Sequence, residues 1–233
     1  MGLSVFSTLF LTVLMFGGAI WTALFTKQCY LPTTFMEGKV VVITGACSGL
    51  GFSSTKLLAE MEAKVVLTCR TLKRAEEARR EIESSSKNNL HIEAMELDLS
   101  DLKSIKTFAT EFKKKQKRLD VLMNNAGVIN IYGEKEFTKD GIEETIAVNH
   151  VAHFYLTRLL LDMIKKSKGR IVNLTSEAHR WASKSFLEDF QGDGNFALQQ
   201  YFNSKLGNVL FSLELQKRLK GTGVCVYSVN PVI

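Results

Sequence analysis

Residues 39–51 read Lys-Val-Val-Val-Ile-Thr-Gly-Ala-Cys-Ser-Gly-Leu-Gly, the most informative stretch for the architecture of the chain. The apolar, β-branched run 40–43 is typical of a strand buried on both faces. Gly45, Gly49 and Gly51 follow it and open an amphipathic stretch. A strand, a glycine-rich turn and a helix in this order favour a phosphate site, because glycine admits a pyrophosphate and the helix N-terminus offers N–H groups. The alternative is a glycine-rich turn without a ligand.

The rest of the chain continues this alternation of strand-like and helical patterns. Apolar strands that alternate with helices indicate a parallel sheet covered on both sides. We therefore predict an α/β fold, a Rossmann-type doubly wound parallel sheet of about six strands with helices on both faces. Strands are expected at 39–44, 64–69, 91–98, 119–125, 169–175 and 223–230, and helices near 50–62, 71–86, 101–117, 140–166 and 198–219.

The composition fits one globular domain with a small appendage. Of 233 residues, 45% are hydrophobic and 23% are charged, which excludes wholesale disorder. The net charge is +6, but the basic residues are scattered apart from the run 113–118, which suits a helix end. Without aromatic interleaving or zinc-like spacing, we expect no nucleic-acid partner and no metal.

The four cysteines show no C-x-x-C pair and no dense framework. They are Cys29, Cys47, Cys69 and Cys225. Cys69 and Cys225 lie in apolar strand-like runs, where cysteine acts as a small hydrophobe. This usage predicts a reducing, cytosol-facing compartment.

The N-terminal residues 3–25 carry no charge and are long enough to cross a bilayer as one helix. The alternative is a cleaved signal peptide, which needs a basic n-region and a shorter apolar core. Lys27 and Lys39 follow the segment. We therefore expect a single-pass membrane protein that contacts lipid through its N-terminus, in the endoplasmic reticulum, with the domain facing the cytosol. The expected division is 1–26 as membrane anchor, 27–38 as linker and 39–233 as dinucleotide-binding domain.

Two positions after later strands suggest which dinucleotide binds. An NAD site places a carboxylate after the second strand, but residues 67–74 contain none and offer Arg70, which suits the 2′-phosphate of NADP(H). Asp98 ends the third strand and can accept a hydrogen bond from the adenine amino group. As alternatives, Arg70 is a solvated residue, and Asp98 or Ser100 caps the helix from Asp101.

A tyrosine and a lysine near the C-terminus have the spacing of an acid–base pair. Tyr201 and Lys205 are four residues apart, which places them on one face of a helix. A neighbouring ammonium favours the ionised form of a phenol, which prepares it for proton transfer. Such a pair also arises by chance, but here Asn124-Asn125-Ala126-Gly127, Asn149 and Ser176 precede it in order.

Together these motifs resemble the short-chain dehydrogenase/reductase family over nearly all of 39–233. The glycine motif is similar to Thr44–Gly51, the N-N-A-G motif to Asn124–Gly127, and the catalytic group to Asn149, Ser176, Tyr201 and Lys205. Finer matches resemble the retinol dehydrogenase branch, at 148–154, 170–176, 187–192 and 204–206.

The resemblance implies a role for each catalytic residue. Tyr201 gives a proton to a carbonyl oxygen, Lys205 assists it and bonds the nicotinamide ribose, Ser176 holds the oxygen, and Asn149 positions a water. It also implies NADP(H), a small lipophilic substrate and compatibility with a homodimer. The expected cofactor-binding residues are Gly45, Ser48, Gly49, Leu50, Gly51, Arg70, Asp98, Asn125, Ala126, Gly127, Tyr201 and Lys205.

Several of these residues also have simpler interpretations. Ser176 can merely begin a turn, and Asn149 can be an exposed polar residue of a helix. His150 and His153 have an i,i+3 spacing that can bind metal, although packing roles are favoured. His179 can line the pocket or lie in solvent.

The C-terminal residues depart from the family pattern. Asn230-Pro231-Val232-Ile233 stands where family members carry Pro-Gly, a substrate-covering segment and a seventh strand. We expect a domain incomplete at its C-terminus, with the sixth strand at an exposed edge. Two functions follow: a membrane-anchored NADP(H)-dependent oxidoreductase for lipophilic alcohols and carbonyls, or a weakly active or inactive protein that binds dinucleotide or partners at the membrane.

Overall fold

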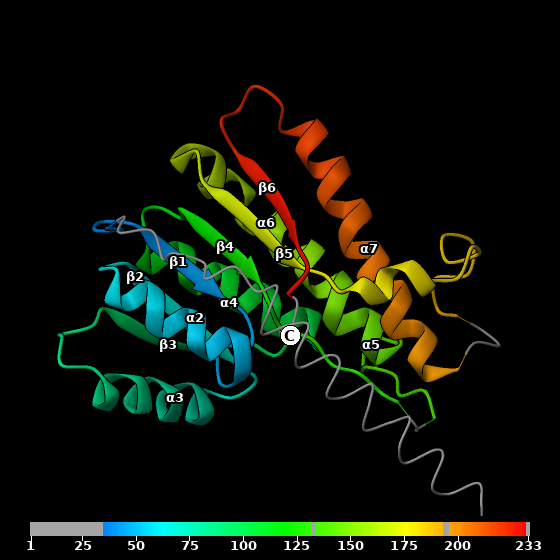
Figure 1. Cartoon of the computed structure of the whole chain (residues 1–233), viewed down its shortest axis with the longest axis horizontal. Coiled ribbons are helices and arrows are strands. Elements are labelled where there is room, and N and C mark those ends of the chain that lie inside the picture. Colours follow the sequence, from blue (N-terminus) through cyan, green and yellow to red (C-terminus); the bar gives the residue numbers. More distant parts are fainter. Residues whose placement is uncertain (1–34, 132–133, 193–195, 232–233) are drawn as a thin grey trace, which may run out of the picture. The chain divides into compact units, whose positions relative to one another are not determined.

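The computed structural model describes residues 35–131, 134–192 and 196–231. In this part of the chain, six strands form one parallel sheet in the order β3-β2-β1-β4-β5-β6 (Figure 1). The predicted doubly wound α/β fold is confirmed. The strands are β1 Val40–Ile43, β2 Lys64–Cys69, β3 Ile92–Glu96, β4 Val121–Asn124, β5 Arg170–Leu174 and β6 Cys225–Val229.

The five predicted helices form, but one of them is divided, and a short 3-10 helix at Glu177–Trp181 was not predicted. The predicted helix near 140–166 is divided, because a π-helical turn lies between its first turn and its main body. Such turns are frequent at functional sites, and this one contains Asn149. The helices are α2 Gly49–Glu60, α3 Leu72–Ser85, α4 Leu102–Lys115, α5 Glu144–Ile146, the π-helical η1 Ala147–Val151, α6 Ala152–Ser167, the 3-10 helical η2 Glu177–Trp181 and α7 Ala197–Arg218.

Alternate residues of the central strand face two separate cores. Val41 and Ile43 belong to a cluster with the buried residues of α2 and α3, whereas Val40 and Val42 belong to one with α4 and α6. Both layers of helices are visible in Figure 1. The run is apolar at every position because successive side chains point to opposite, covered faces.

The chain order of the sheet reverses beside β1. β1 pairs with β2 on one side and with β4 on the other. In open α/β sheets, ligands bind outside the carboxyl ends of the strands at this switch point. β6 lies at one edge of the described sheet, and most of its residues are exposed.

Membrane attachment falls largely outside the described residues. The predicted span 3–25 and most of the predicted linker lie there. Within residues 35–131, 134–192 and 196–231, no helix is long and apolar enough to cross a bilayer.

The cysteines differ from the prediction. Cys47 follows β1 and Cys69 ends β2, so neighbouring strands bring their Cα atoms to 5.9 Å, and the two form a disulfide. The prediction that Cys69 acts as a simple hydrophobe is therefore wrong. Local spacing could not predict this disulfide, because the pairing depends on which strands are neighbours in the sheet. Cys225 is a free thiol but is exposed rather than buried. The cysteines thus do not by themselves indicate a reducing compartment.

Candidate active site

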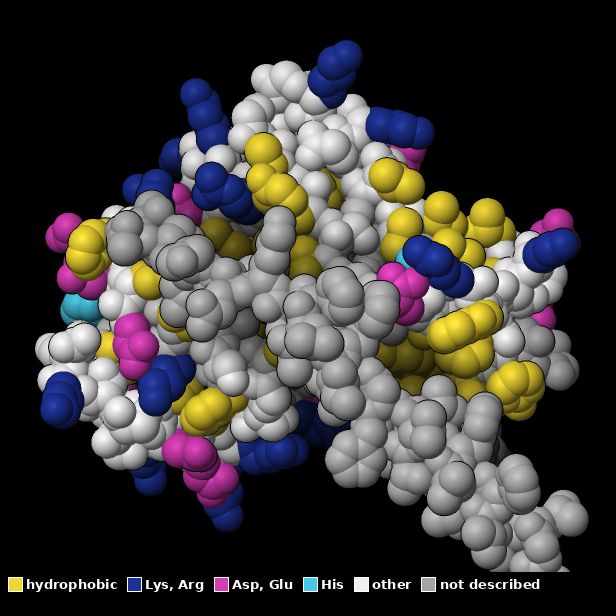
Figure 2. Space-filling model, in the orientation of Figure 1, with side chains coloured by type: hydrophobic (Ala, Val, Ile, Leu, Met, Phe, Trp, Pro, Cys, Tyr) yellow, Lys and Arg dark blue, Asp and Glu magenta, His cyan; other side chains and the backbone are white. Residues whose placement is uncertain are grey.

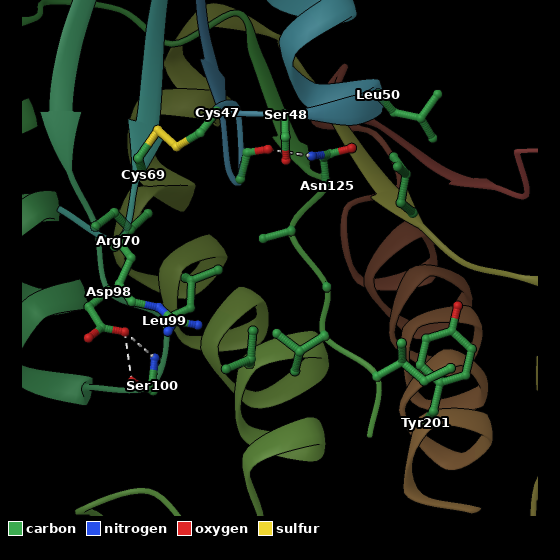
Figure 3. A pocket seen from close by; sticks show the side chains of 18 of the residues that line it. Cys47, Ser48, Leu50, Cys69, Arg70, Asp98, Leu99, Ser100, Asn125 and Tyr201 are labelled. Atoms are coloured by element: carbon green, nitrogen blue, oxygen red, sulfur yellow. Dashed lines mark hydrogen bonds between the residues drawn. A yellow bond between two sulfur atoms is a disulfide. The ribbon is translucent and has the colours of Figure 1, made fainter. Parts of the chain in front are cut away.

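A cavity of about 470 Å³ opens at the carboxyl ends of the strands (Figure 3). Its lining comes from the turn after β1, from the segments after β2, β3 and β4, and from α7. Ten predicted site residues are among those that line it: Gly45, Ser48, Leu50, Arg70, Asp98, Asn125, Ala126, Gly127, Tyr201 and Lys205. Gly49, Gly51, Asn149 and Ser176 are not part of the lining.

The glycines of the first turn meet different requirements. A Cβ on Gly51 would lie 2.4 Å from the carbonyl oxygen of Gly45, so this position has no room for a side chain. A Cβ on Gly45 would lie 2.8 Å from the Cα of Ala126. Gly49 has room, but its φ of +53° is one that other residues rarely adopt. Gly45 also has a positive φ, of +64°, so Gly51 serves close packing, Gly49 serves the backbone turn, and Gly45 serves both.

The turn after β1 is bonded to the turn after β4 through Thr44. Its hydroxyl oxygen accepts hydrogen bonds from the backbone N–H groups of Asn125 at 2.9 Å and Ala126 at 3.0 Å. In return, the Asn125 side-chain amide donates to the Thr44 carbonyl at 2.8 Å. Thr44 was not predicted as a site residue. Its position at the end of the first strand, before Gly45, is the sequence feature that could have indicated this role.

Arg70 and Asp98 lie on the opposite side of the cavity from Tyr201 (Figure 3). Arg70 directly follows β2 and is exposed. Asp98 accepts hydrogen bonds from the backbone and hydroxyl of Ser100, at 2.9 and 2.7 Å. The alternative that Asp98 or Ser100 caps the next helix is wrong, because Asp101 is the N-cap of α4.

One further cation on this side of the cavity was not predicted from the sequence. Arg74 also lines the cavity. It lies in the first turn of α3, four residues after Arg70. This four-residue spacing from Arg70 is the sequence feature that could have indicated Arg74.

Tyr201 and Lys205 lie one turn apart on α7, as predicted. The Lys205 Nζ is 5.4 Å from the centre of the Tyr201 ring and 3.5 Å from the Leu174 carbonyl oxygen, to which it donates. Burial lowers the pKa of Lys205 to about 8, because an ammonium is poorly solvated there. A Cβ on Gly127 would lie 3.5 Å from both Lys205 Nζ and Asn149 Oδ1. The lysine, the asparagine and the turn after β4 therefore converge.

Asn149 is fully buried, so its interpretation as an exposed helical residue is wrong. Its Oδ1 accepts from the backbone of Val128 at 2.7 Å, and its Nδ2 donates to the Val128 carbonyl at 2.9 Å and to the Ser204 hydroxyl at 3.0 Å. The side chain thus joins the turn after β4 to α7. The water that Asn149 was expected to position stays a prediction.

Ser176 does begin a turn, as one of its two interpretations held. Its Oγ accepts from the backbone N–H of Ala178 at 3.2 Å and caps η2. This bond uses a lone pair, so the hydroxyl proton can still be donated to a substrate. His179 donates through Nδ1 to the Ser176 carbonyl at 2.6 Å and does not line the cavity.

The side chains of His150 and His153 are both packed among neighbouring residues. His153 is 1% exposed, and each ring makes hydrogen bonds to neighbouring groups. Among the residues that the structure describes, no group of three or more His, Cys, Asp or Glu side chains could hold a metal ion.

An apolar surface adjoins Tyr201. Trp181 packs on Phe202, with ring centres 5.8 Å apart, and Phe202 contacts Tyr201. Trp181, Leu187 and Phe196 are 65%, 75% and 64% exposed. Figure 2 shows hydrophobic side chains gathered on the side of the molecule where Figure 1 places η2 and α7.

With this geometry, the chain matches a known family. Residues 39–233 match the family model for short chain dehydrogenase, and the chain belongs to this family. Among its relatives, it is 48% identical to retinol dehydrogenase 12 of Bos taurus over 198 residues, an alignment that covers 84% of this chain and 61% of the relative. It is 45% identical over 201 residues to retinol dehydrogenase 11 of Homo sapiens, covering 85% and 62%. The predicted resemblance to the retinol dehydrogenase branch is confirmed.

Solved structures agree with the fold. The crystal structure of a metagenomic short-chain oxidoreductase in complex with NADP matches with a TM-score of 0.70 and 29% identity, over 84% of this chain and 82% of that one. The chain spans about three fifths of the length of the two retinol dehydrogenases.

Proposed function

We propose that this chain is an NADP(H)-dependent oxidoreductase that transfers a hydride between the nicotinamide and a lipophilic alcohol or carbonyl compound. The observation that carries the proposal is the pair Tyr201 and Lys205, which lies on one face of α7 and lines the cavity. The glycine-rich turn and Arg70 line the same cavity away from this pair (Figure 3).

The lining residues fit a dinucleotide with a 2′-phosphate. The N-terminus of α2, where Ser48 is the N-cap and Leu50 lies in the first turn, offers backbone N–H groups to the pyrophosphate. Arg70 and Arg74 offer charge to the 2′-phosphate, and Asp98 offers an acceptor to the adenine amino group. The NADP complex of the metagenomic oxidoreductase supports this choice of cofactor.

In the proposed reaction, the cofactor supplies or accepts the hydride, and the side chains handle the proton. Tyr201 donates its phenolic proton to the carbonyl oxygen, and the Lys205 ammonium stabilises the phenolate that remains. Ser176 donates a hydrogen bond to the same oxygen. Asn149 keeps the Gly127–Val128 turn against Lys205, so the nicotinamide end of the site has a fixed wall.

The apolar surface beside Tyr201 supports a lipophilic substrate. Trp181 offers exposed apolar area beside Phe202, which contacts Tyr201, and Leu187 and Phe196 are further exposed apolar side chains between η2 and α7 in the sequence. The similarity to retinol dehydrogenases 11 and 12 favours a retinoid-like, steroid-like or lipid-aldehyde-like compound.

Membrane attachment completes the proposal. Residues 1–26 anchor the protein in the endoplasmic reticulum membrane, residues 27–38 link this anchor to the domain, and the domain 39–233 faces the cytosol. The uncharged run 3–25 supports this arrangement.

The test follows NADPH oxidation with a panel of apolar aldehydes and ketones, together with NADPH binding by calorimetry. Binding with turnover is the expected result. Binding without turnover would instead support the alternative of a dinucleotide-binding protein, and failure to bind NADPH would overturn the cofactor assignment.

A further inference from the structure

His153 is a buried titratable group that the proposed reaction does not use. It lies in the first turn of α6 and is 1% exposed. Both ring nitrogens have partners: Nδ1 is 3.0 Å from the Asn149 carbonyl oxygen, and Nε2 is 2.8 Å from the Thr44 hydroxyl oxygen. These partners belong to the two halves of the site, the cofactor turn and the catalytic group.

The partners decide the tautomer of the ring. A carbonyl oxygen only accepts, so Nδ1 carries the proton. The Thr44 oxygen already accepts from the backbone N–H groups of Asn125 and Ala126, which fills its two lone pairs. Nε2, at 2.8 Å, therefore accepts the Thr44 hydroxyl proton in preference to the Met123 carbonyl oxygen at 3.5 Å, and a charged imidazolium could not accept it. Burial lowers the pKa of His153 to about 4, which keeps the ring neutral.

The network continues from the Asn149 carbonyl to the catalytic lysine. That oxygen also accepts from Asn208 Nδ2 at 3.0 Å, and the same amide donates to the Leu174 carbonyl at 3.2 Å. Lys205 Nζ donates to the Leu174 carbonyl as well. A continuous set of hydrogen bonds thus joins Thr44 to Lys205 through buried groups.

We propose that His153 is a positioning residue that holds the Asn125–Ala126 turn in a fixed relation to Asn149 and Lys205, through a neutral imidazole with its proton on Nδ1. This inference rests on the proposed function. The ring orients the Thr44 hydroxyl so that its lone pairs meet the two backbone N–H groups of the turn. It also fixes the Asn149 carbonyl, to which Asn208 donates, and Asn208 in turn shares the Leu174 carbonyl with Lys205.

The first test compares His153→Leu with His153→Gln. Leucine has a similar size but no polar atom, whereas glutamine keeps one donor and one acceptor. Loss of one buried hydrogen bond corresponds to about tenfold in an equilibrium constant. We expect His153→Leu to raise the NADPH dissociation constant about tenfold and to lower kcat, and His153→Gln to recover most of both. Thr44→Val should weaken NADPH binding further, because it also removes the acceptor of the Asn125 and Ala126 backbone N–H groups, and adding His153→Leu to Thr44→Val should cost little more.

The second test uses the parent protein, so it does not depend on how the variants fold. The ¹⁵N NMR signals of His153 should report a neutral ring protonated on Nδ1 at pH 7. His91→Gln, at the exposed end of the segment before β3, serves as control and should leave binding and kcat unchanged.

Two outcomes would overturn the inference while the proposed function stands. One is an Nε2-protonated or charged His153 ring. The other is a His153→Leu variant with parental kcat and NADPH affinity, whether or not its melting temperature falls. An inactive parent that does not bind NADPH would instead mark failure of the proposed function, and the NMR result would still decide the tautomer.

Discussion

Removal of the Arg70 charge should change cofactor choice. Arg70 follows β2 directly, lines the cavity and occupies the position where an NAD site needs a carboxylate. A charge-assisted hydrogen bond to a phosphate contributes about 1.5–3 kcal/mol. Because Arg70 is exposed, its contact is partly screened, and we take the lower end of this range.

A loss of about 1.5 kcal/mol corresponds to roughly a tenfold rise in dissociation constant. Arg70→Ala should therefore weaken NADPH about tenfold and change NADH less than twofold, because NADH has no 2′-phosphate. Arg70→Asp should go further, since it repels the phosphate and offers an acceptor to the 2′-hydroxyl of NADH. The effect on NADPH should shrink at high salt.

The assay is a titration of both cofactors against the parent and each variant, followed by cofactor fluorescence. Lys73→Ala is the matched control, because Lys73 is an exposed neighbour that is not in the lining. Arg70→Ala/Arg74→Ala would show whether the second arginine shares the contact. Equal weakening of NADPH and NADH binding would show that Arg70 does not contact the 2′-phosphate and would make it a structural residue.

Three further predictions test other parts of the account. Gly51→Ala should destabilise the domain by roughly 1–3 kcal/mol, seen as a lower melting temperature, because its Cβ would lie 2.4 Å from a backbone oxygen; Gly127→Ala, whose nearest neighbour would be at 3.5 Å, should not. Lys205→Met should abolish turnover yet stabilise the fold by up to about 3 kcal/mol below pH 8, because the pKa of Lys205 is about 8 in the folded protein and burial of its ammonium is unfavourable there. This gain in the free energy of unfolding should fade towards pH 10.5, since the unfolded lysine keeps its proton over that range while the folded one loses it. Denaturant unfolding from pH 7 to 10.5 measures the gain, and a pH-independent difference would contradict the prediction. Alkaline carbonate should not extract the full chain from membranes, whereas a chain that begins at Met36 should be extracted, and a mature protein that begins after residue 26 would indicate a cleaved signal instead.

The strands and helices could be predicted from sequence because each rests on a local pattern. The run 40–43 is apolar at every position, and the sheet covers both of its faces. Tyr201 and Lys205 were placed correctly because an i,i+4 spacing fixes their relation in a helix. Local periodicity is sufficient for such features.

The remaining features depend on contacts between distant segments. Thr44 meets Asn125 across 81 residues, and the Cys47–Cys69 disulfide needs β1 and β2 to be neighbours. The π-helical turn at Asn149 was not predicted either, since its side-chain partners Val128 and Ser204 lie 21 and 55 residues away. No window of sequence contains these pairs, so spacing alone could not identify them.

We propose Tyr201 as the proton donor for hydride transfer at this site. The most direct measurement is the single-turnover rate of NADPH oxidation with an apolar aldehyde, compared between the parent and Tyr201→Phe. Phenylalanine keeps the ring and its contact with Phe202 but cannot deliver a proton. We expect the single-turnover rate to fall by about 10²–10⁴-fold with NADPH affinity nearly unchanged. A Tyr201→Phe rate within a few-fold of the parent rate would contradict it.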